Sequence, residues 1–421
     1  MEKHIIKQIL LEQKDEIARI FNKTLVDREV MPYAKKVFKT DLIKAVMGIR
    51  RCGKSTISHQ LLKGQRYGYV NFDDERLIGV TAKGLNDFLE VLEEINPGLK
   101  YILLDEIQNV EGWELFVNRL KRLDYNITVT GSNSRLLSKE LATHLTGRHF
   151  SIELLPFSFR EFLKFKSIVI NNDDFYLTKQ KANIKRELEE YMEIGGMPEL
   201  FKIEVKKSYL RELFDKIISR DIIFRYEVKY ARDLKELALY AVSAFASRFT
   251  YHKIKDIFGI KSVHTIKNYL SYMEEAYLIF QLNPFSFKVK QQINQPRKFY
   301  CIDTGFINAL APKVTLDRGK LMENIVFTEL KRRGKEVYFY SQPDYEVDFL
   351  VKEGLKIEQL IQVCFSVADR DTKKRETKAL LYACDKLRCN DLVIITWDKD
   401  AEEALNSKKI KFISLGNWLL K

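Results

Sequence analysis

The sequence lacks several features that would point to particular classes of protein. No apolar run approaches the roughly 18 residues of a membrane span, so we expect no membrane association. The N-terminal stretch is charged, with apolar residues at helical spacing, and has no signal-peptide core followed by a small-residue cleavage site. The five cysteines show no CxxC spacing, and the six histidines form no HExxH or similar pair. These absences argue against a disulfide framework or a zinc site and predict a cytoplasmic protein.

Composition and charge narrow the possibilities further. The chain has 421 residues, of which 46% are hydrophobic and 31% charged, as is typical of a globular protein. Its length predicts about two to four domains. Lys and Arg total 71 against 58 Asp and Glu, a net charge of +13. This excess favours a polyanionic partner, above all DNA, although solvated lysine-rich surfaces give the same excess in ordinary cytosolic proteins.

The stretch 48–56 (GIRRCGKST) follows the pattern G-x-x-x-x-G-K-S. A short apolar run of strand type, 42–47, precedes it, and a segment with helical spacing follows. This setting predicts a phosphate-binding loop, in which Lys54 reaches the β- and γ-phosphates and the Ser55 hydroxyl ligates Mg²⁺. A chance match in a loop is the alternative, which the flanking pattern disfavours. The predicted nucleotide contacts are Gly48, Arg50, Arg51, Cys52, Gly53, Lys54, Ser55 and Thr56.

A second motif supports the first. Residues 101–106 (YILLDE) form an apolar strand that ends in two carboxylates, as a Walker B element does. We expect Asp105 to hold Mg²⁺ through water and Glu106 to polarise the attacking water. Together the two motifs predict a protein that binds and hydrolyses a nucleoside triphosphate.

Strands and helices alternate around these motifs, which predicts a parallel α/β sheet. We expect strands near 42–47, 68–73, 101–105, 126–130 and 150–154, and helices near 54–63, 84–95, 112–122 and 134–145. Residues 1–40 are expected to form a helix and then a basic connector from Tyr33 to Lys39.

Polar residues after these strands are further candidates for the site. Asp73, Asp74 and Glu75 follow the second strand and serve either the nucleotide site or a solvated turn. After the fourth strand, Ser132 or Asn133 is placed to bond the γ-phosphate or the attacking water.

Two arginines between the fourth and fifth strands are candidates for a different role. Arg148 precedes the fifth strand, where a guanidinium could serve the γ-phosphate of a neighbouring subunit or else pair locally. Arg135 is a weaker candidate of the same kind.

These segments also carry a family resemblance. GIRRCGKST, YVNFDDERL, LLDEIQNVEGWE, VTGSNSRLLS and LTGRHFSIELLPFSFREFL resemble, in order and spacing, a group of AAA-type ATPases of bacteria and archaea that typically carry a C-terminal domain of unknown function. The match covers most of the first 165 residues and continues beyond them. The resemblance implies the AAA strand order, ATP and Mg²⁺ as cofactors, hydrolysis to ADP and phosphate, and Arg148 as the arginine finger.

Residues 234–303 have a different pattern. Three helices (234–249, 250–259 and 262–278) precede two strands (279–282 and 297–301) that flank a basic loop, which predicts a winged helix-turn-helix. Such a fold either binds DNA or contacts a protein partner. The predicted DNA contacts are His264 and Lys267 on the third helix and Lys288, Lys290, Arg297 and Lys298 in the wing.

The C-terminal residues 304–421 predict helices at 319–330 and 371–388 and strands at 337–340, 345–351, 360–365, 391–396 and 410–414. This order resembles the restriction-endonuclease-like, or PD-(D/E)XK, fold. Glu323, Asp348 and Gln362 match its site positions, but Cys364 stands where that fold has a lysine. A thiol with a pKa of ~8.5 substitutes poorly for an ammonium, so we expect weak or absent cleavage. Lys352 or Lys356 could take the missing role.

The sequence thus predicts an α/β protein in four parts: an AAA-type core with an N-terminal helix at 1–165, a helical lid or linker at 166–233, a winged helix at 234–303, and a restriction-endonuclease-like domain at 304–421. The favoured function is an ATPase, possible as a homo-oligomer, coupled to DNA. Two alternatives stay open: a metal-dependent nuclease gated by the ATPase, and an ATP-loaded switch that docks protein partners with negligible turnover. Lys54, Asp105 and Glu106 favour turnover, and Cys364 counts against the nuclease.

Overall fold

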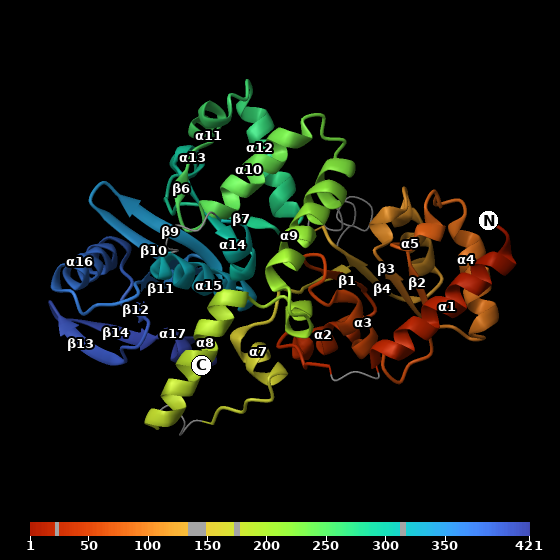
Figure 1. Ribbon diagram of the computed structural model, residues 1–421, viewed down its shortest axis with the longest axis horizontal. Coiled ribbons are helices and arrows are strands. Elements are labelled where there is room, and N and C mark those ends of the chain that lie inside the picture. Colours follow the sequence, from red (N-terminus) through yellow and green to blue (C-terminus); the bar gives the residue numbers. More distant parts are fainter. Residues whose placement is uncertain (22–24, 134–148, 172–176, 312–316) are drawn as a thin grey trace. The chain divides into compact units, whose positions relative to one another are not determined.

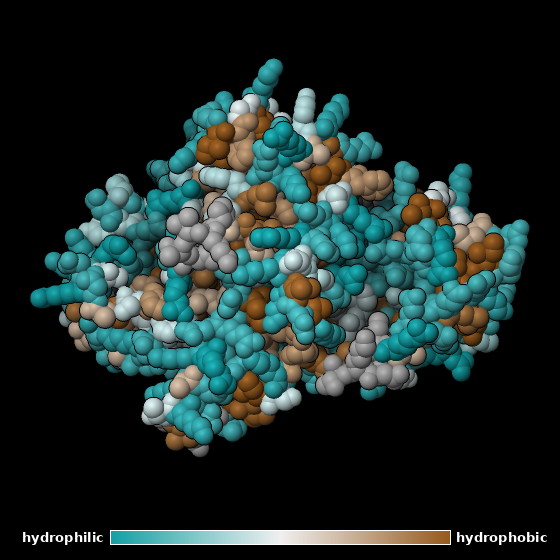
Figure 2. All heavy atoms as spheres, in the orientation of Figure 1, coloured by the Kyte–Doolittle hydropathy of each residue, from teal (hydrophilic) through white to brown (hydrophobic). Residues whose placement is uncertain are grey.

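The computed structural model describes residues 1–21, 25–133, 149–171, 177–311 and 317–421 (Figure 1). The chain divides into two units. The first comprises Met1–Leu155 with Glu275–Tyr277, and the second comprises Pro156–Glu274 and Leu278–Lys421. Within the described ranges, no helix is long and apolar enough to cross a membrane. The face drawn in Figure 2 is mainly hydrophilic, in keeping with the large share of charged residues.

The first unit is built on a five-stranded parallel sheet in the order β2-β3-β4-β1-β5. Helices cover both faces of a parallel sheet, so its central strands are buried, and all five residues of β1 are buried, Lys44 included. The predicted parallel sheet is confirmed, and each strand boundary lies within two residues of its predicted place. The strands are β1 (Ile43–Met47), β2 (Tyr67–Asn71), β3 (Tyr101–Asp105), β4 (Asn126–Gly131) and β5 (His149–Glu153).

Helices connect these strands. The predicted helices after the first three strands are present as α3 (Lys54–Leu61), α4 (Leu85–Ile95) and α5 (Trp113–Arg122), with short 3-10 turns η1 (Glu75–Leu77) and η2 (Ile107–Asn109). The helix predicted at 134–145 lies outside the described residues.

The N-terminal region contains two helices where the sequence suggested one. The first, α1 (Lys3–Phe21), packs against α4 and β2. The second, α2 (Met31–Phe38), occupies most of the stretch predicted to be a basic connector, so that prediction was wrong. Met31, Ala34 and Val37 are buried at helical spacing, and this apolar stripe outweighs the lysines that suggested a connector.

The second unit begins with α7 (Phe159–Phe165), which precedes the predicted helical lid or linker at 166–233. Within that predicted range lie α8 (Thr178–Ile194), η4 (Pro198–Lys202), α9 (Lys206–Lys216) and the π-helical segment η5 (Ile217–Phe224). Helix α8 ends at Gly195, which has φ +79 and would place a Cβ 1.9 Å from Asp303 Oδ1. The next residue, Gly196, donates its N–H to Asp303 Oδ2 at 2.6 Å, so the two glycines fasten this turn to a distant loop.

Residues 231–301 form four helices and a small antiparallel sheet in the order β6-β8-β7. The predicted elements are present in the predicted order, but the first helix is shorter because Arg248–Phe249 pairs with β8 as a strand. A helix in the basic loop was not predicted. The elements are α10 (Ala231–Ser243), β6 (Arg248–Phe249), α11 (Tyr251–Phe258), α12 (Val263–Glu275), β7 (Ile279–Leu282), α13 (Val289–Asn294) and β8 (Arg297–Cys301).

The C-terminal part is a six-stranded mixed sheet in the order β13-β14-β12-β11-β10-β9. All the predicted helices and strands are present, while α14, α17 and the edge strand β13 were not predicted. Backbone hydrogen bonds of Phe339 with Asn283 and Phe285 join β9 to the chain that follows β7. The elements are α14 (Thr304–Leu310), α15 (Arg318–Arg332), β9 (Glu336–Gln342), β10 (Tyr345–Glu353), β11 (Lys356–Val363), α16 (Arg370–Leu387), β12 (Leu392–Thr396), β13 (Ala401–Leu405), β14 (Lys408–Ser414) and α17 (Leu415–Leu420).

Candidate nucleotide site and a buried carboxylate cluster

The phosphate loop, residues 48–53, joins β1 to α3. Gly48 is required by close packing, because a Cβ there would lie 2.1 Å from the backbone oxygen of Leu154. Gly53 has φ +100, in the left-handed region that favours glycine, and stands at the N-cap of α3. The loop therefore opens directly onto a helix N-terminus, where backbone N–H groups point outward along the helix axis and favour an anion.

Lys54 and Glu106 form an ion pair at the start of α3. Lys54 Nζ lies 3.1 Å from Glu106 Oε1, and the two side chains are only 4% and 14% exposed. Burial disfavours the charged form of Lys54, but the charges of Glu106, Cys52 and Asp105 and the hydrogen bond with Glu106 together outweigh burial and raise the pKa of Lys54. Burial also opposes ionisation of Glu106, yet the charges of Lys54 and Arg50 lower the pKa of Glu106 to about 2. Both groups are therefore charged at neutral pH.

Asp105 lies at the end of β3 and is held by residues of three other elements. Tyr69 donates its hydroxyl to Asp105 Oδ2 at 3.2 Å, and Thr130 donates its hydroxyl to Oδ1. Burial and the charge of Glu106 raise the pKa of Asp105, while hydrogen bonds from Ser55 and Thr130 oppose the rise. The two predicted Mg²⁺ ligands, Ser55 and Asp105, are thus brought into contact.

Thr130 is a site residue that the sequence did not single out. Besides contacting Asp105, its hydroxyl accepts the backbone N–H of Glu106 at 3.0 Å, and Glu106 itself has φ +50. Thr130 therefore helps to fix the backbone of both carboxylates. It precedes the predicted Ser132 and Asn133 by two and three residues, and each of those two is buried with 1% exposure directly after β4.

The three acidic residues after β2 have different roles. Asp73 Oδ2 lies 3.2 Å from Arg50 Nη1, so Asp73 holds an arginine of the phosphate loop. Asp74 caps η1 and accepts the side chain of Gln13 at 2.9 Å, which makes it structural. Glu75 is exposed. The alternatives left open by the sequence are therefore resolved residue by residue.

Arg28 also supports the loop and was not found from the sequence. Its guanidinium is buried, and it donates to the backbone oxygens of Cys52 (2.9 Å) and Leu155. It stands 24 residues before its partner in the loop, in a stretch without a motif, so no local signal marked it. Burial raises the pKa of the Cys52 thiol, and the fully buried side chain leaves only the backbone of Cys52 to contact a ligand.

Four further residues were predicted for the nucleotide site: Arg51, Thr56, Arg135 and Arg148. Arg51 is exposed with φ +69, and Thr56 is partly buried in α3. Arg148 and Arg135 lie outside the described residues, so their roles stay predictions.

Four of the six predicted DNA contacts are exposed: His264, Lys267, Lys288 and Lys290. Arg297 is partly buried, and its guanidinium lies 5.2 Å from the ring centroid of Tyr251. Lys267 Nζ lies 5.3 Å from the same ring, so cations from α12 and β8 converge on one tyrosine.

The sixth prediction, that Lys298 contacts DNA from the wing, was wrong. Lys298 is 3% exposed and faces the protein interior, so it cannot contact DNA phosphates from the wing. Neighbouring residues of a strand point to opposite faces, so Arg297 and Lys298 cannot both serve one surface. Lys298 and Tyr300 share the inward face.

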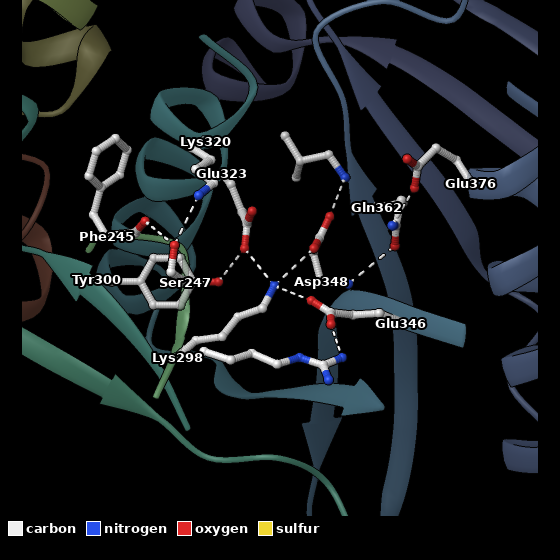
Figure 3. Close-up of polar contacts among 12 residues, drawn as sticks. Phe245, Ser247, Lys298, Tyr300, Lys320, Glu323, Glu346, Asp348, Gln362 and Glu376 are labelled. Carbon is white, nitrogen blue, oxygen red and sulfur yellow. Dashed lines mark hydrogen bonds and ion pairs between the residues drawn. The ribbon is translucent and has the colours of Figure 1, made fainter. Parts of the chain in front are cut away.

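Lys298 lies at the centre of a group that we call the carboxylate cluster: Lys298, Glu323, Glu346 and Asp348. Its Nζ lies 2.8 Å from Glu323 Oε1, 2.6 Å from Glu346 Oε1 and 3.1 Å from Asp348 Oδ1 (Figure 3). The residues come from β8, α15 and β10. Tyr300 donates its hydroxyl to the same Glu323 oxygen at 2.6 Å.

The side chains of Asp348 and Gln362 lie close together, and each accepts a hydrogen bond from a backbone N–H group. Asp348 Oδ2 accepts the N–H of Val363 at 3.0 Å, and Gln362 Oε1 accepts the N–H of Asp348 at 3.2 Å (Figure 3). The amide of Gln362 donates to Glu376 of α16. All three predicted residues of the nuclease-like site therefore meet at one place.

A cavity of about 1090 Å³ lies beside the cluster. Glu323, Asp348 and Gln362 line it together with basic residues such as Lys320 and Arg375. Burial and the charge of Asp348 raise the pKa of Glu323 to about 7, against the opposing charge of Lys298.

The lysines proposed to replace the missing one do not reach the cluster. Asp348 and Lys352 are four residues apart on one strand, a separation of about 13 Å along it. Lys352 pairs instead with Glu336 at 3.2 Å, and Lys356 lies at the hairpin end of β11 opposite Glu353. Burial raises the pKa of the Cys364 thiol to about 12, so this residue contributes no charge.

Replacing Glu323 by Gln is expected to remove a pH dependence of stability. The pKa of Glu323 is raised from 4.5 to about 7, so the folded protein retains a proton that the unfolded chain loses as pH rises. The free energy of unfolding of the wild type should therefore fall relative to Glu323→Gln between about pH 5 and pH 7, and the difference should then level off. Urea unfolding of both proteins across this range measures it. A constant difference would contradict the prediction.

Three families match successive parts of the chain. Residues 40–163 match a family described as an AAA domain. Residues 185–317 and 318–418 match two families described as domains of unknown function, DUF8612 and DUF4143. The predicted AAA-type ATPase core is therefore confirmed, together with a C-terminal domain of unknown function.

Two relatives match along nearly their whole length. An uncharacterized protein of Methanocaldococcus jannaschii is 36% identical over 429 residues, covering 95% of each chain. An uncharacterized protein of Haemophilus influenzae is 30% identical over 420 residues, covering 95% of this chain and all of that protein.

Solved structures match more weakly. The replication initiator DnaA bound to AMPPCP and single-stranded DNA is 19% identical, covers 59% of this chain and 86% of that chain, and has a TM-score of 0.24. A signal transduction ATPase with numerous domains from Pyrococcus horikoshii is 12% identical and has a TM-score of 0.29. The match covers 74% of this chain and 46% of that chain. TM-scores this low carry no structural argument.

Proposed function

We infer that this chain, which belongs to the same family as the M. jannaschii and H. influenzae proteins, binds ATP with Mg²⁺ and hydrolyses it to ADP and phosphate. One observation carries the proposal. Lys54, Ser55, Asp105 and Glu106 come from two separate motifs and meet at the carboxyl edge of the parallel sheet, where the phosphate loop opens onto α3.

The residues present fit ATP and Mg²⁺. The loop offers backbone N–H groups at a helix N-terminus and the cations Lys54 and Arg50, which suit phosphate oxygens. Ser55 and Asp105 offer two adjoining oxygen ligands, which suit Mg²⁺. When bound, the metal would neutralise charge on the phosphates.

Glu106 is the group we assign to water activation. Its pKa of about 2 leaves it ionised at neutral pH, so it can orient a water molecule and accept its proton. In the structure Glu106 holds Lys54 at 3.1 Å. Glu106 therefore has to release Lys54 before it can act as a base, which would tie catalysis to the filling of the phosphate site.

ATP turnover by the full-length protein tests this proposal. It should be measured with and without duplex, forked and single-stranded DNA, while the integrity of that DNA is followed on a gel. We expect Mg²⁺-dependent release of phosphate and intact DNA. No turnover under any of these conditions would favour the ATP-loaded switch, and DNA cleavage would favour the nuclease.

We further propose that residues 234–303 form a winged helix that couples the ATPase to DNA. The order of three helices and three antiparallel strands supports it, as do the exposed His264, Lys267, Lys288 and Lys290. A protein partner on the same surface is the alternative. A homo-oligomer in which Arg148 serves the neighbouring subunit is a further proposal, and it rests on the sequence alone.

Reversing Lys267, Lys288 and Lys290 to Glu is expected to weaken DNA binding and leave basal ATP turnover unchanged. Three fewer phosphate contacts should reduce the slope of log affinity against log salt by about 3. Fluorescence anisotropy of labelled duplex at several salt concentrations measures this. A charge-matched control reverses Lys179, Lys181 and Lys207, which are exposed on or beside other helices. Equal losses in both variants would mean that only net charge matters.

For residues 304–421 we propose a restriction-endonuclease-like fold that serves for docking rather than cleavage. The strand order and the placement of α15 and α16 support the fold. The neutral Cys364 and the distant Lys352 and Lys356 support the absence of cleavage.

A further inference from the structure

We propose that the ammonium group of Lys298 takes the place of a divalent metal in the carboxylate cluster. The C-terminal fold would then hold its converging carboxylates together with a cation of its own. This inference concerns a different site from the ATPase and does not depend on it.

The first argument is the geometry of the ammonium. A protonated lysine has three N–H donors. Lys298 donates hydrogen bonds to Glu323 at 2.8 Å and to Asp348 at 3.1 Å, and its Nζ forms an ion pair with Glu346 at 2.6 Å. One carboxylate comes from a helix and two from a strand, as expected of ligands that meet around a single cation. Figure 3 shows the Lys298 side chain reaching into the centre of this group.

The second argument is that the oxygens a metal would need are already in use. Mg²⁺ requires several oxygen ligands at about 2.0–2.1 Å in near-octahedral geometry. Both oxygens of Asp348 accept hydrogen bonds, from Lys298 and from the backbone of Val363. Both oxygens of Glu346 also have partners, because Oε1 forms an ion pair with Lys298 and Oε2 forms one with Arg248. Among the described residues, Glu323 Oε2 is the one carboxylate oxygen of the cluster that takes part in neither a hydrogen bond nor an ion pair.

Lys298 is supplied by a strand of a different sheet from the one that carries Glu346 and Asp348. It comes from β8, in the small antiparallel sheet, and not from the segment directly after β11, where Cys364 lies. The small sheet is joined to the C-terminal sheet through the hydrogen bonds of Phe339 with Asn283 and Phe285. The cation is therefore supplied by a neighbouring part of the second unit and anchored there by the fold. Without the ammonium of Lys298, Glu323 and Asp348 would face each other with no cation between them.

Mn²⁺ binding by the full-length protein, without nucleotide, tests the proposal. Titrations followed by electron paramagnetic resonance compare the wild type with Lys298→Met and with Lys298→Met/Asp348→Asn. We expect Lys298→Met to gain about one Mn²⁺ site per chain that the wild type lacks and the double variant loses. Lys352→Met is the matched control, because Lys352 pairs with a carboxylate elsewhere in the same sheet.

Each outcome decides for or against the proposal. A Mn²⁺ site in the wild type that Asp348→Asn abolishes would overturn it, because metal and ammonium would then coexist. A folded Lys298→Met protein that binds no additional Mn²⁺ would also overturn it. If Lys298→Met stays soluble only when purified with Mn²⁺, the proposal is supported. Lys298→Gln, which keeps an amide donor and loses the charge, provides the same comparison should Lys298→Met not fold.

Discussion

A Glu106→Gln protein is expected to bind ATP as the wild type does and to hydrolyse it about 10²–10⁴-fold more slowly. The amide keeps the size and polarity of the side chain but cannot accept a proton from water. Binding should survive because Lys54, the loop backbone and the Ser55–Asp105 pair are unchanged. Phosphate release under saturating ATP and the affinity for a fluorescent ATP analogue separate the two effects.

Whereas Glu106→Gln should slow hydrolysis alone, Lys54→Ala is expected to abolish ATP binding. It removes the buried ammonium at the start of α3 and leaves Glu106 without its ion-pair partner, so ATP binding itself should be lost. Glu75→Gln is a suitable control, since it changes an exposed carboxylate after the neighbouring strand. Hydrolysis at the wild-type rate by Glu106→Gln would show that another group activates the water.

Lys298→Met is expected to lower the free energy of unfolding of the second unit by about 3–5 kcal/mol. The variant leaves two buried carboxylates, Glu323 and Asp348, without the charge that compensates them. Methionine has nearly the same length as lysine, so the loss reports charge and hydrogen bonding more than packing. If the cluster were only loosely packed and solvated, the effect would be far smaller.

Tryptophan fluorescence can follow this unit alone. The chain has three tryptophans, and in a Trp113→Phe background only Trp397 and Trp418 of the second unit remain. Urea unfolding then compares Lys298→Met with Lys352→Met, whose partly exposed ion pair should contribute about 0–1 kcal/mol. Equal losses would contradict the central role of Lys298.

Local patterns were enough to predict the residues of the candidate nucleotide site, because these residues are contiguous in two motifs. A parallel strand that must be buried on both faces reads as an apolar run, and its carboxyl end lies at the same edge as its neighbours. Lys54, Ser55, Asp105 and Glu106 could therefore be assigned from their places after two such runs. The resemblance of residues 304–421 to the restriction-endonuclease-like fold, and not such a pattern, singled out Glu323, Asp348 and Gln362, which lie together in the structure.

Contacts between segments that are far apart in the sequence could not be predicted from local patterns. Arg28 and Thr130 support the nucleotide site across separations of 24 and 25 residues. Arg28 lies outside any motif, and Thr130 was not singled out within the segment VTGSNSRLLS. The basic stretch at Tyr33–Lys39 proved to be part of a helix because its apolar stripe is buried against the first unit.

By itself, the sequence determined most of the helices and strands, the parallel sheet of the first unit and the two motifs whose residues meet at its phosphate loop. Only the tertiary structure decided the role of Lys298. A lysine in a basic loop looks solvent-exposed in the sequence, and the alternation of a strand shows only that Arg297 and Lys298 point in opposite directions. Which of the two faces the interior depends on the packing of β8 against α15 and β10, where three carboxylates converge on one ammonium.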